Sequence, residues 1–393
     1  MRKEISQFIF LMFLFLSLFS CELNEEIGNL NLSIAWKVDS ENYGNQRLAI
    51  DEEKERVYVN ETWNGTMSAI DIKSGKLLWR SDEIVFSGTN AVFDEKYVYN
   101  VGWKLPGEKE VIFVQLDKET GDIVKTKKLG ESREILARMN SLSFYNDTLY
   151  WGAKDSHFVH AYNTQDDADS YKVWGSEDVT ADIMGDIVPY NGRLYFVAEV
   201  YPYVDDPKPS RLISMLPDGT DVKELEIPVD FMGVDTNAIQ IYDGKLYLNG
   251  VYFICLDPET FKIEWELKRN EGFYSSYGFT IHEGKIYTAT NINSCDSVFC
   301  IDAKKGKIIW QEKLDSSYGT IGYQPQVYKG YVYLPTQSSL IVLNAKTGKY
   351  VGRDEKIETG GLSLGATECY NDLIIFSDMG EHVIAVKMDM HTR

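Results

Sequence analysis

A short strand-like segment built around an aliphatic–tyrosine pair recurs at intervals of 40 to 52 residues along this chain, and isoleucine replaces tyrosine in the last copy. The eight pairs are Val57-Tyr58, Val98-Tyr99, Leu149-Tyr150, Leu194-Tyr195, Leu246-Tyr247, Ile286-Tyr287, Val332-Tyr333 and Ile374-Ile375. Self-similarity at such a period is the signature of a repeat architecture, in which neighbouring copies share a core. This array restricts the possible folds more than any other feature of the sequence.

Each repeat reads as four short strands. In the sixth repeat, apolar and polar residues alternate within the segments 277–281, 285–289, 298–301 and 307–311. A period of two is typical of strands and not of helices. Four antiparallel strands in a unit of about 40 to 50 residues form one blade of a β-propeller. We therefore expect an all-β fold, an eight-bladed β-propeller of four-stranded antiparallel blades.

The turn between the third and fourth strands has its own pattern, which in the first repeat places Asp71 and Gly75 four residues apart and Trp79 four residues later. Aspartate and serine oxygens accept hydrogen bonds from turn amides, and glycine supplies positive φ. The other copies of this structural turn contain Asp117, Gly121, Asp257, Trp265, Asp302, Gly306, Trp310 and Gly348. We expect these tryptophans, together with Trp174, to pack between neighbouring blades.

The pattern resembles the repeat of the pyrroloquinoline-quinone-like propellers, Ala-x-Asp-x-x-Thr-Gly-x-x-x-Trp. The first repeat matches it at Ala69, Asp71, Gly75 and Trp79, with Ser74 in the threonine position. The resemblance extends over nearly the whole mature chain and implies the propeller fold. It does not choose a function, because the family includes quinone-dependent dehydrogenases and many non-enzymatic propellers.

The strand count predicts how the ring closes. The last predicted third strand, 383–386, is followed only by residues 387–393, which contain neither the turn nor a tryptophan. Residues 31–38 read as a fourth strand with its own Trp36, but they precede the first repeat. We expect this N-terminal strand to complete the last blade, so that residues 30–393 form a single domain without an open edge.

The N-terminus reads as a lipoprotein leader. Arg2 and Lys3 precede an apolar run that is too short for a stable transmembrane helix, and the run ends at Leu18-Phe19-Ser20-Cys21, which resembles a bacterial lipobox. We expect residues 1–20 to be a signal peptide, Cys21 to be lipidated and residues 21–29 to form a polar tether. The alternative is a plain secretory signal with an incidental cysteine. The expected location is the outer membrane, on either the periplasmic face or the cell surface.

Charge and chemistry exclude several function classes. The net charge of −20 and the absence of a basic stripe argue against nucleic acid as a partner. Cys255 and Cys300 occupy equivalent positions in adjacent repeats, so we expect no disulfide between them. His157 and His160 lie three apart on a predicted strand and face opposite sides, which disfavours a shared metal. The acidic loop with Asp166, Asp167 and Asp169 matches no calcium motif.

Catalysis is not expected. The quinone-dependent dehydrogenases of this fold have an adjacent cysteine pair over the cofactor, calcium ligands from Glu, Asn and Asp, and a much longer chain. No two cysteines are adjacent in this sequence. The expectation is therefore no cofactor, no metal and no catalytic residue, with a quinone-dependent dehydrogenase as the less favoured alternative.

The remaining function is binding, through loops at one mouth of the central channel. The longest of these loops are aromatic and contribute the candidate residues Trp103, Tyr201, Tyr203, Tyr274, Tyr277, Tyr318 and Tyr323. Exposed rings of this kind form protein hot spots or stack on sugars, although each ring could instead fold back onto the propeller.

Two non-enzymatic interpretations follow for a monomeric, lipid-anchored propeller. The chain is similar to the propeller lipoprotein of the outer-membrane β-barrel assembly machinery, which is a protein-binding scaffold. The alternative is a cell-surface lipoprotein that binds glycan or another envelope protein.

Overall fold

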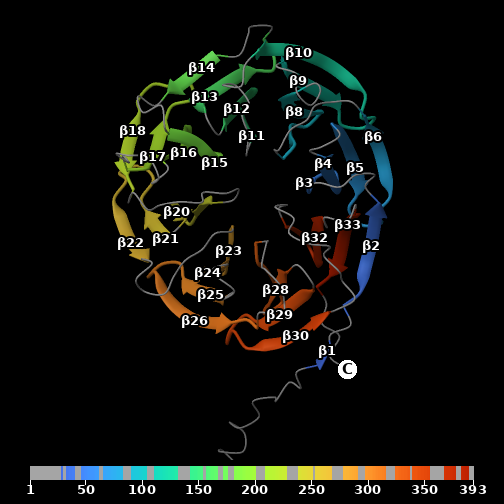
Figure 1. Ribbon diagram of the computed structural model, residues 1–393, viewed down its shortest axis with the longest axis vertical. Coiled ribbons are helices and arrows are strands. Elements are labelled where there is room, and N and C mark those ends of the chain that lie inside the picture. Colours follow the sequence, from blue (N-terminus) through green and yellow to red (C-terminus); the bar gives the residue numbers. More distant parts are fainter. Residues whose placement is uncertain are drawn as a thin grey trace, which may run out of the picture.

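Eight small sheets stand around a central axis in the computed structural model (Figure 1). The structure describes residues 28–29, 32–39, 46–61, 65–82, 90–103, 110–131, 142–153, 156–166, 171–175, 181–200, 209–227, 238–250, 253–267, 278–290, 297–315, 324–336, 339–354, 367–377 and 382–388. All regular elements in these ranges are strands. The all-β, eight-bladed prediction is confirmed.

Blades 1 to 4 follow the chain, and each runs from the innermost to the outermost strand. Blade 1 consists of β3 (Gln46–Asp51), β4 (Arg56–Glu61), β5 (Thr66–Asp71) and β6 (Leu77–Ser81). Blade 2 consists of β7 (Val92–Phe93), β8 (Tyr97–Trp103), β9 (Glu110–Asp117) and β10 (Ile123–Glu131). Blade 3 consists of β11 (Leu142–Tyr145), β12 (Thr148–Ala153), β13 (Ser156–Asn163) and β14 (Tyr171–Gly175). Blade 4 consists of β15 (Ala181–Tyr190), β16 (Arg193–Val200), β17 (Arg211–Met215) and β18 (Lys223–Glu226).

Blades 5 to 8 continue in the same order. Blade 5 consists of β19 (Ile239–Tyr242), β20 (Lys245–Asn249), β21 (Phe253–Leu256) and β22 (Ile263–Leu267). Blade 6 consists of β23 (Phe279–His282), β24 (Lys285–Thr290), β25 (Ser297–Asp302) and β26 (Lys307–Lys313). Blade 7 consists of β27 (Gln326–Tyr328), β28 (Tyr331–Pro335), β29 (Leu340–Asn344) and β30 (Tyr350–Asp354). Blade 8 consists of β31 (Glu368–Tyr370), β32 (Leu373–Ser377), β33 (His382–Lys387) and β2 (Ile34–Asp39).

The ring closes through the N-terminal strand, as the sequence predicts. Strand β2 pairs antiparallel with β33, with Ile34 opposite Val386 and Asp39 opposite His382. The strand begins at Ile34, slightly later than the predicted residue 31. Because β2 is the outer strand of blade 8, the last blade contains the two ends of the domain.

A second N-terminal strand was not predicted. Strand β1 (Gly28–Asn29) pairs parallel with the outer strand β30, with Gly28 opposite Gly352. Further along, the Leu32 amide donates a buried hydrogen bond of 2.7 Å to a carboxylate oxygen of Asp354. The chain therefore passes along blade 7 before it enters blade 8 (Figure 1). The predicted leader 1–20 and Cys21 lie outside the described residues.

The hydrophobic core lies between neighbouring blades. Each of its eight clusters combines side chains from the facing sheets of two blades, as in the cluster shared by blades 3 and 4. All seven tyrosines of the repeated pair are buried. Several of their hydroxyls donate to a backbone carbonyl of the next blade, as from Tyr247 to Ala303 (3.3 Å) and from Tyr287 to Ala345 (3.4 Å). The tyrosine recurs because it fills the inter-blade core and also satisfies a turn carbonyl.

No helix that is long and apolar enough to cross a membrane occurs in the part of the chain that the structure describes.

Candidate functional site

One end of the propeller contains the connections from second to third strands and from fourth to first strands. Most residues of these connections lie outside the described ranges. The same holds for six of the predicted binding residues, which are Tyr201, Tyr203, Tyr274, Tyr277, Tyr318 and Tyr323. Their role therefore stays a prediction.

Trp103 is the one candidate binding residue that the structure places. It is the last residue of β8, opposite Val111, and it does not lie in the following loop. Its half-buried side chain packs against the core cluster between blades 2 and 3. This ring therefore contributes to the blade interface at the edge of the candidate binding end.

The opposite end contains the turns between third and fourth strands. In blade 1, one carboxylate oxygen of Asp71 accepts hydrogen bonds from the Ser74 amide (2.8 Å) and the Ser74 hydroxyl (2.5 Å). The hydroxyl bond is the main reason that the pKa of Asp71 lies below its usual value. In blade 5, Asp257 accepts the same two bonds from Thr260, at 3.0 and 2.9 Å. Asp117 and Asp302 accept amide hydrogen bonds in their turns.

Four of these turns, in blades 1, 2, 6 and 7, are also sockets for the tryptophan of the preceding blade. The indole Nε1 donates to the carbonyl of the residue after the turn aspartate or asparagine. These bonds join Trp36 to Ile72 (2.8 Å), Trp79 to Lys118 (2.9 Å), Trp265 to Ala303 (2.9 Å) and Trp310 to Ala345 (3.0 Å).

The turn glycines form the floor of this socket. A Cβ on Gly306 would lie 2.4 Å from a ring atom of Trp265, and its φ is +65°. Gly75, Gly121 and Gly348 face Trp36, Trp79 and Trp310 in the same way. Trp174 departs from the pattern, because its ring packs edge-to-face on Phe196 of blade 4 at 5.2 Å. These turn residues thus hold neighbouring blades together.

The interface of blades 1 and 2 contains a buried charge pair that sequence reasoning missed. Lys118 follows the turn aspartate Asp117, and its ammonium lies 2.7 Å from Asp51 of blade 1, with both side chains 3% exposed. It also donates to the Asp94 carbonyl (2.5 Å) and lies 4.6 Å from the centre of the Phe93 ring. Lys118 and Asp51 are 67 positions apart in the sequence, so no local sequence pattern could indicate this pair.

Polar side chains of the first strands join neighbouring blades near the axis. Each donor lies opposite the residue that ends the repeated pair, and it donates to a carbonyl in the first strand of the next blade or directly before that strand. These bonds run from Ser143 to Ile187, from Gln240 to Phe279, from Thr280 to Pro325 (2.5 Å) and from Gln326 to Thr367 (2.9 Å).

Glu368 occupies the equivalent position in blade 8, opposite Ile375. By analogy with the other blades, we expect the Leu48 carbonyl of blade 1 to be the acceptor nearest to it, because Leu48 precedes the residue opposite Tyr58. Burial raises the pKa of Glu368 to about 7. A carboxyl group can donate a hydrogen bond to a carbonyl only when it is protonated, so this position is sensitive to pH near neutrality.

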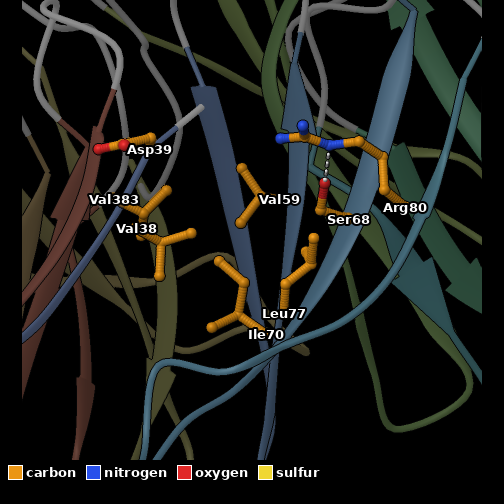
Figure 2. A pocket seen from close by; sticks show the side chains of 8 residues that line it. All are labelled: Val38, Asp39, Val59, Ser68, Ile70, Leu77, Arg80 and Val383. Atoms are coloured by element: carbon orange, nitrogen blue, oxygen red, sulfur yellow. Dashed lines mark hydrogen bonds between the residues drawn. The ribbon is translucent and has the colours of Figure 1, made fainter. Parts of the chain in front are cut away.

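A small crevice lies at the seam between the closing strand β2 and blade 1 (Figure 2). The space inside it is only about 10 Å³, about enough for one water molecule. Arg80 lies at its edge and donates to the Ser68 hydroxyl at 3.2 Å. Its mostly apolar lining comes from Val38, Val59, Ile70, Leu77 and Val383. Ligand sites are usually larger and combine several convergent polar groups, so this crevice does not qualify as one.

Metal-binding and redox chemistry find little support in the described residues. Within these residues, no three His, Cys, Asp or Glu side chains come together to hold a metal. His160 is buried and stacks on Trp151 at 5.5 Å, as a core residue would. Cys255, Cys300 and Cys369 are free thiols, and burial raises the pKa of each to about 11. Thiols of this kind are poor nucleophiles.

Comparison with known proteins agrees with this geometry. The sequence profile of the family described as outer membrane protein assembly factor BamB matches residues 249–389. No curated protein sequence matches the chain significantly. Among solved structures, the chain is similar to BamB from Moraxella catarrhalis, with 12% identity and a TM-score of 0.65 over 92% of this chain and 99% of that one.

Other solved structures share the fold. Quinohemoprotein alcohol dehydrogenase from Comamonas testosteroni is similar at 11% identity and a TM-score of 0.66, over 95% of this chain and 78% of the dehydrogenase. The computationally designed Ika8 protein is similar at 12% identity and a TM-score of 0.64, over 90% of this chain and 99% of Ika8. The chain is therefore a β-propeller of pyrroloquinoline-quinone-like repeats that is similar in fold to BamB.

Proposed function

We propose that this chain is a non-catalytic, lipid-anchored scaffold that binds protein partners in the bacterial outer membrane, in the assembly of outer-membrane proteins. The observation that carries this proposal is the match of residues 249–389 to the BamB family, on a propeller that covers 99% of the Moraxella catarrhalis BamB chain. The lipobox-like segment that ends at Cys21 supports the anchor.

The proposal places partner binding at the end of the propeller that contains the long aromatic loops. A ring of blades locked by tryptophan sockets is a rigid support, and rigid supports suit loop-borne binding sites. Trp103 lies at the edge of this end and is half-buried, so its ring can contact a partner without leaving the blade.

The dehydrogenase alternative requires a cofactor cradle that the described residues do not provide. The resemblance implies an adjacent cysteine pair and calcium ligands, whereas Cys255, Cys300 and Cys369 stand in three different blades. Within the described part of the chain no cluster of metal-ligating side chains accompanies them. These residues do not fit a quinone and its metal, and we derive no reaction through one.

Affinity capture tests the scaffold function. The full-length chain with a C-terminal tag is expressed in its host, gently crosslinked, extracted in detergent and analysed by mass spectrometry. We expect subunits of the barrel-assembly machinery to be enriched over a Cys21→Ser control, which cannot be lipidated. Recovery of nutrient-uptake porins or glycan-processing lipoproteins, or of nothing above the control, would contradict the scaffold function. Enrichment of glycan-processing lipoproteins would favour the cell-surface alternative.

A further inference from the structure

Exposed lysines gather in the turns between third and fourth strands of blades 6 and 7. These two turns, residues 302–307 and 344–349, contain one carboxylate, that of Asp302. They are neighbours, because Trp310 of blade 6 donates to the Ala345 carbonyl of blade 7. We use the name lysine patch for the five exposed residues Lys304, Lys305, Lys307, Lys346 and Lys349.

Four of these lysines have no ion-pair partner in the part of the chain that the structure describes. Within the described residues, Lys304, Lys307, Lys346 and Lys349 form no ion pair, and Lys305 is 3.9 Å from Asp302. Some lysines elsewhere in the described residues have a close carboxylate partner. Lys73 of blade 1 lies 2.5 Å from Glu55, and Lys245 of blade 5 lies 2.5 Å from Glu264.

The fold does not require lysine in these turns. The position of Lys346, two residues after the turn Asp or Asn, is Glu119 in blade 2 and Glu259 in blade 5. In both turns the backbone amide of the glutamate donates to the turn aspartate, as the Lys346 amide donates to Asn344. The lysine patch is therefore a local feature of blades 6 and 7, in a chain whose net charge is −20. Its chemistry fits an anionic surface.

The path of the N-terminus brings this patch close to the expected anchor. Strand β1 pairs with β30 of blade 7, with Gly28 opposite Gly352. Lys349 precedes Gly352 by three residues, which is roughly 10 Å along an extended strand. Cys21 precedes Gly28 by seven residues, which is at most about 25 Å of extended chain. Lipid on Cys21 would thus hold blade 7 near the membrane surface.

We propose that the lysine patch rests on the anionic phospholipid surface of the membrane that holds the anchor and so orients the propeller with blades 6 and 7 toward the lipid. This proposal rests on the lipid anchorage in the proposed function. Lysines near an anionic bilayer strengthen binding by about fivefold each, and one anchor combined with a basic patch gives stable attachment.

Vesicle sedimentation tests the proposal without the anchor or any protein partner. A chain that begins at residue 22 keeps every strand of the propeller. It is mixed at 50 mM NaCl with vesicles of phosphatidylcholine, either alone or with 30% phosphatidylglycerol. We expect binding to the anionic vesicles only, and a loss of most of it at 300 mM NaCl because salt screens exposed charges.

A matched pair of variants locates the contact. Lys346→Gln/Lys349→Gln in blade 7 should weaken binding to anionic vesicles by about tenfold or more. Lys73→Gln/Lys76→Gln changes the equivalent positions of blade 1 and should leave binding within about twofold of the original chain. Circular dichroism checks that both variants keep the fold.

Equal binding of the unsubstituted chain to neutral and anionic vesicles would overturn the proposal, as would an equal loss in the two variants. Either result would leave the capture experiment unaffected, since that experiment reads protein partners. Conversely, failure of the capture experiment would not change vesicle binding by this soluble chain, so the two failures are distinguishable.

Discussion

The interface between blades 6 and 7 and the interface between blades 1 and 2 use the same socket with different contents. In the first, Trp310 and Tyr287 both donate to the carbonyl of Ala345, a small buried residue. In the second, Trp79 donates to the carbonyl of Lys118, whose ammonium is buried against Asp51. The backbone carbonyl is common to both interfaces, and the side chain behind it is not.

The difference shows that the socket depends on the backbone carbonyl and on the turn glycine. The side chain of the residue after the turn Asp or Asn is free to vary. At blades 6 and 7 that position contributes only packing. At blades 1 and 2 it contributes a charge whose desolvation has to be balanced by Asp51, the Asp94 carbonyl and the Phe93 ring. We therefore expect the charged interface to be the less tolerant of single substitutions.

The largest effect should come from breaking the buried pair. Lys118→Met leaves the Asp51 carboxylate buried without its cation, which should lower the free energy of unfolding by about 3–5 kcal/mol. Urea denaturation measures this change. The double variant Lys118→Met/Asp51→Asn removes both charges and should regain at least half of the loss. A double variant no more stable than Lys118→Met would show that the pair does not explain the effect.

The next effect tests the glycine floor of the socket. Gly306→Ala places a Cβ 2.4 Å from the Trp265 ring at a φ of +65°, and we expect a loss of about 2–4 kcal/mol. Gly284→Ala in the same blade has a similar φ of +72° but no atom within 4 Å of the added Cβ, so it should lose only about 1 kcal/mol. Equal losses in thermal denaturation would mean that backbone strain, and not the tryptophan, sets the requirement.

A third effect extends the comparison to the seam between blades 8 and 1, where Glu368 takes the place of a neutral donor. Its raised pKa of about 7 means that the folded state prefers the protonated carboxyl. This contribution to stability is therefore fully present below pH 4.5 and is lost as the pH rises through 7. Glu368→Gln should abolish this loss.

Urea denaturation at pH 5 and pH 8 measures the contribution of Glu368 to the free energy of unfolding. The free energy of unfolding of Glu368→Gln relative to the original chain should rise by about 1–3 kcal/mol between these two values. Thr280→Val, at the equivalent position of blade 6, serves as a control whose effect should not depend on pH. A pH-independent difference for Glu368→Gln would contradict the assignment.

The smallest effect concerns the tyrosine hydroxyl. Tyr247→Phe keeps the ring in the core and removes the 3.3 Å bond to the Ala303 carbonyl. That carbonyl retains the bond from Trp265, so the loss should be only about 0.5–1 kcal/mol in urea denaturation. A loss above about 2 kcal/mol would show that the tyrosine, and not the tryptophan, holds this socket together.

Much of the fold could be predicted because each repeat signals itself locally. Alternating apolar residues and the Asp-to-Gly turn indicate the strands. The strand with Trp36, which precedes the first repeat, predicted that the N-terminus completes the last blade. Strand β1 escaped prediction, since a two-residue strand has no periodicity and its partner lies more than 300 residues away. The candidate binding residues were less accessible to sequence reasoning. Trp103 was expected in a loop, but it ends β8.

The sequence by itself determined the number of blades, their strand order and the positions of the turn residues, because these depend on neighbours within a few residues. Only the tertiary structure decided what those residues contact. It brings Gly306 under Trp265, Lys118 against Asp51 and the N-terminal Gly28 beside Gly352 of blade 7. Such contacts join residues of different blades, and closure of the ring, not the local chain, brings them together.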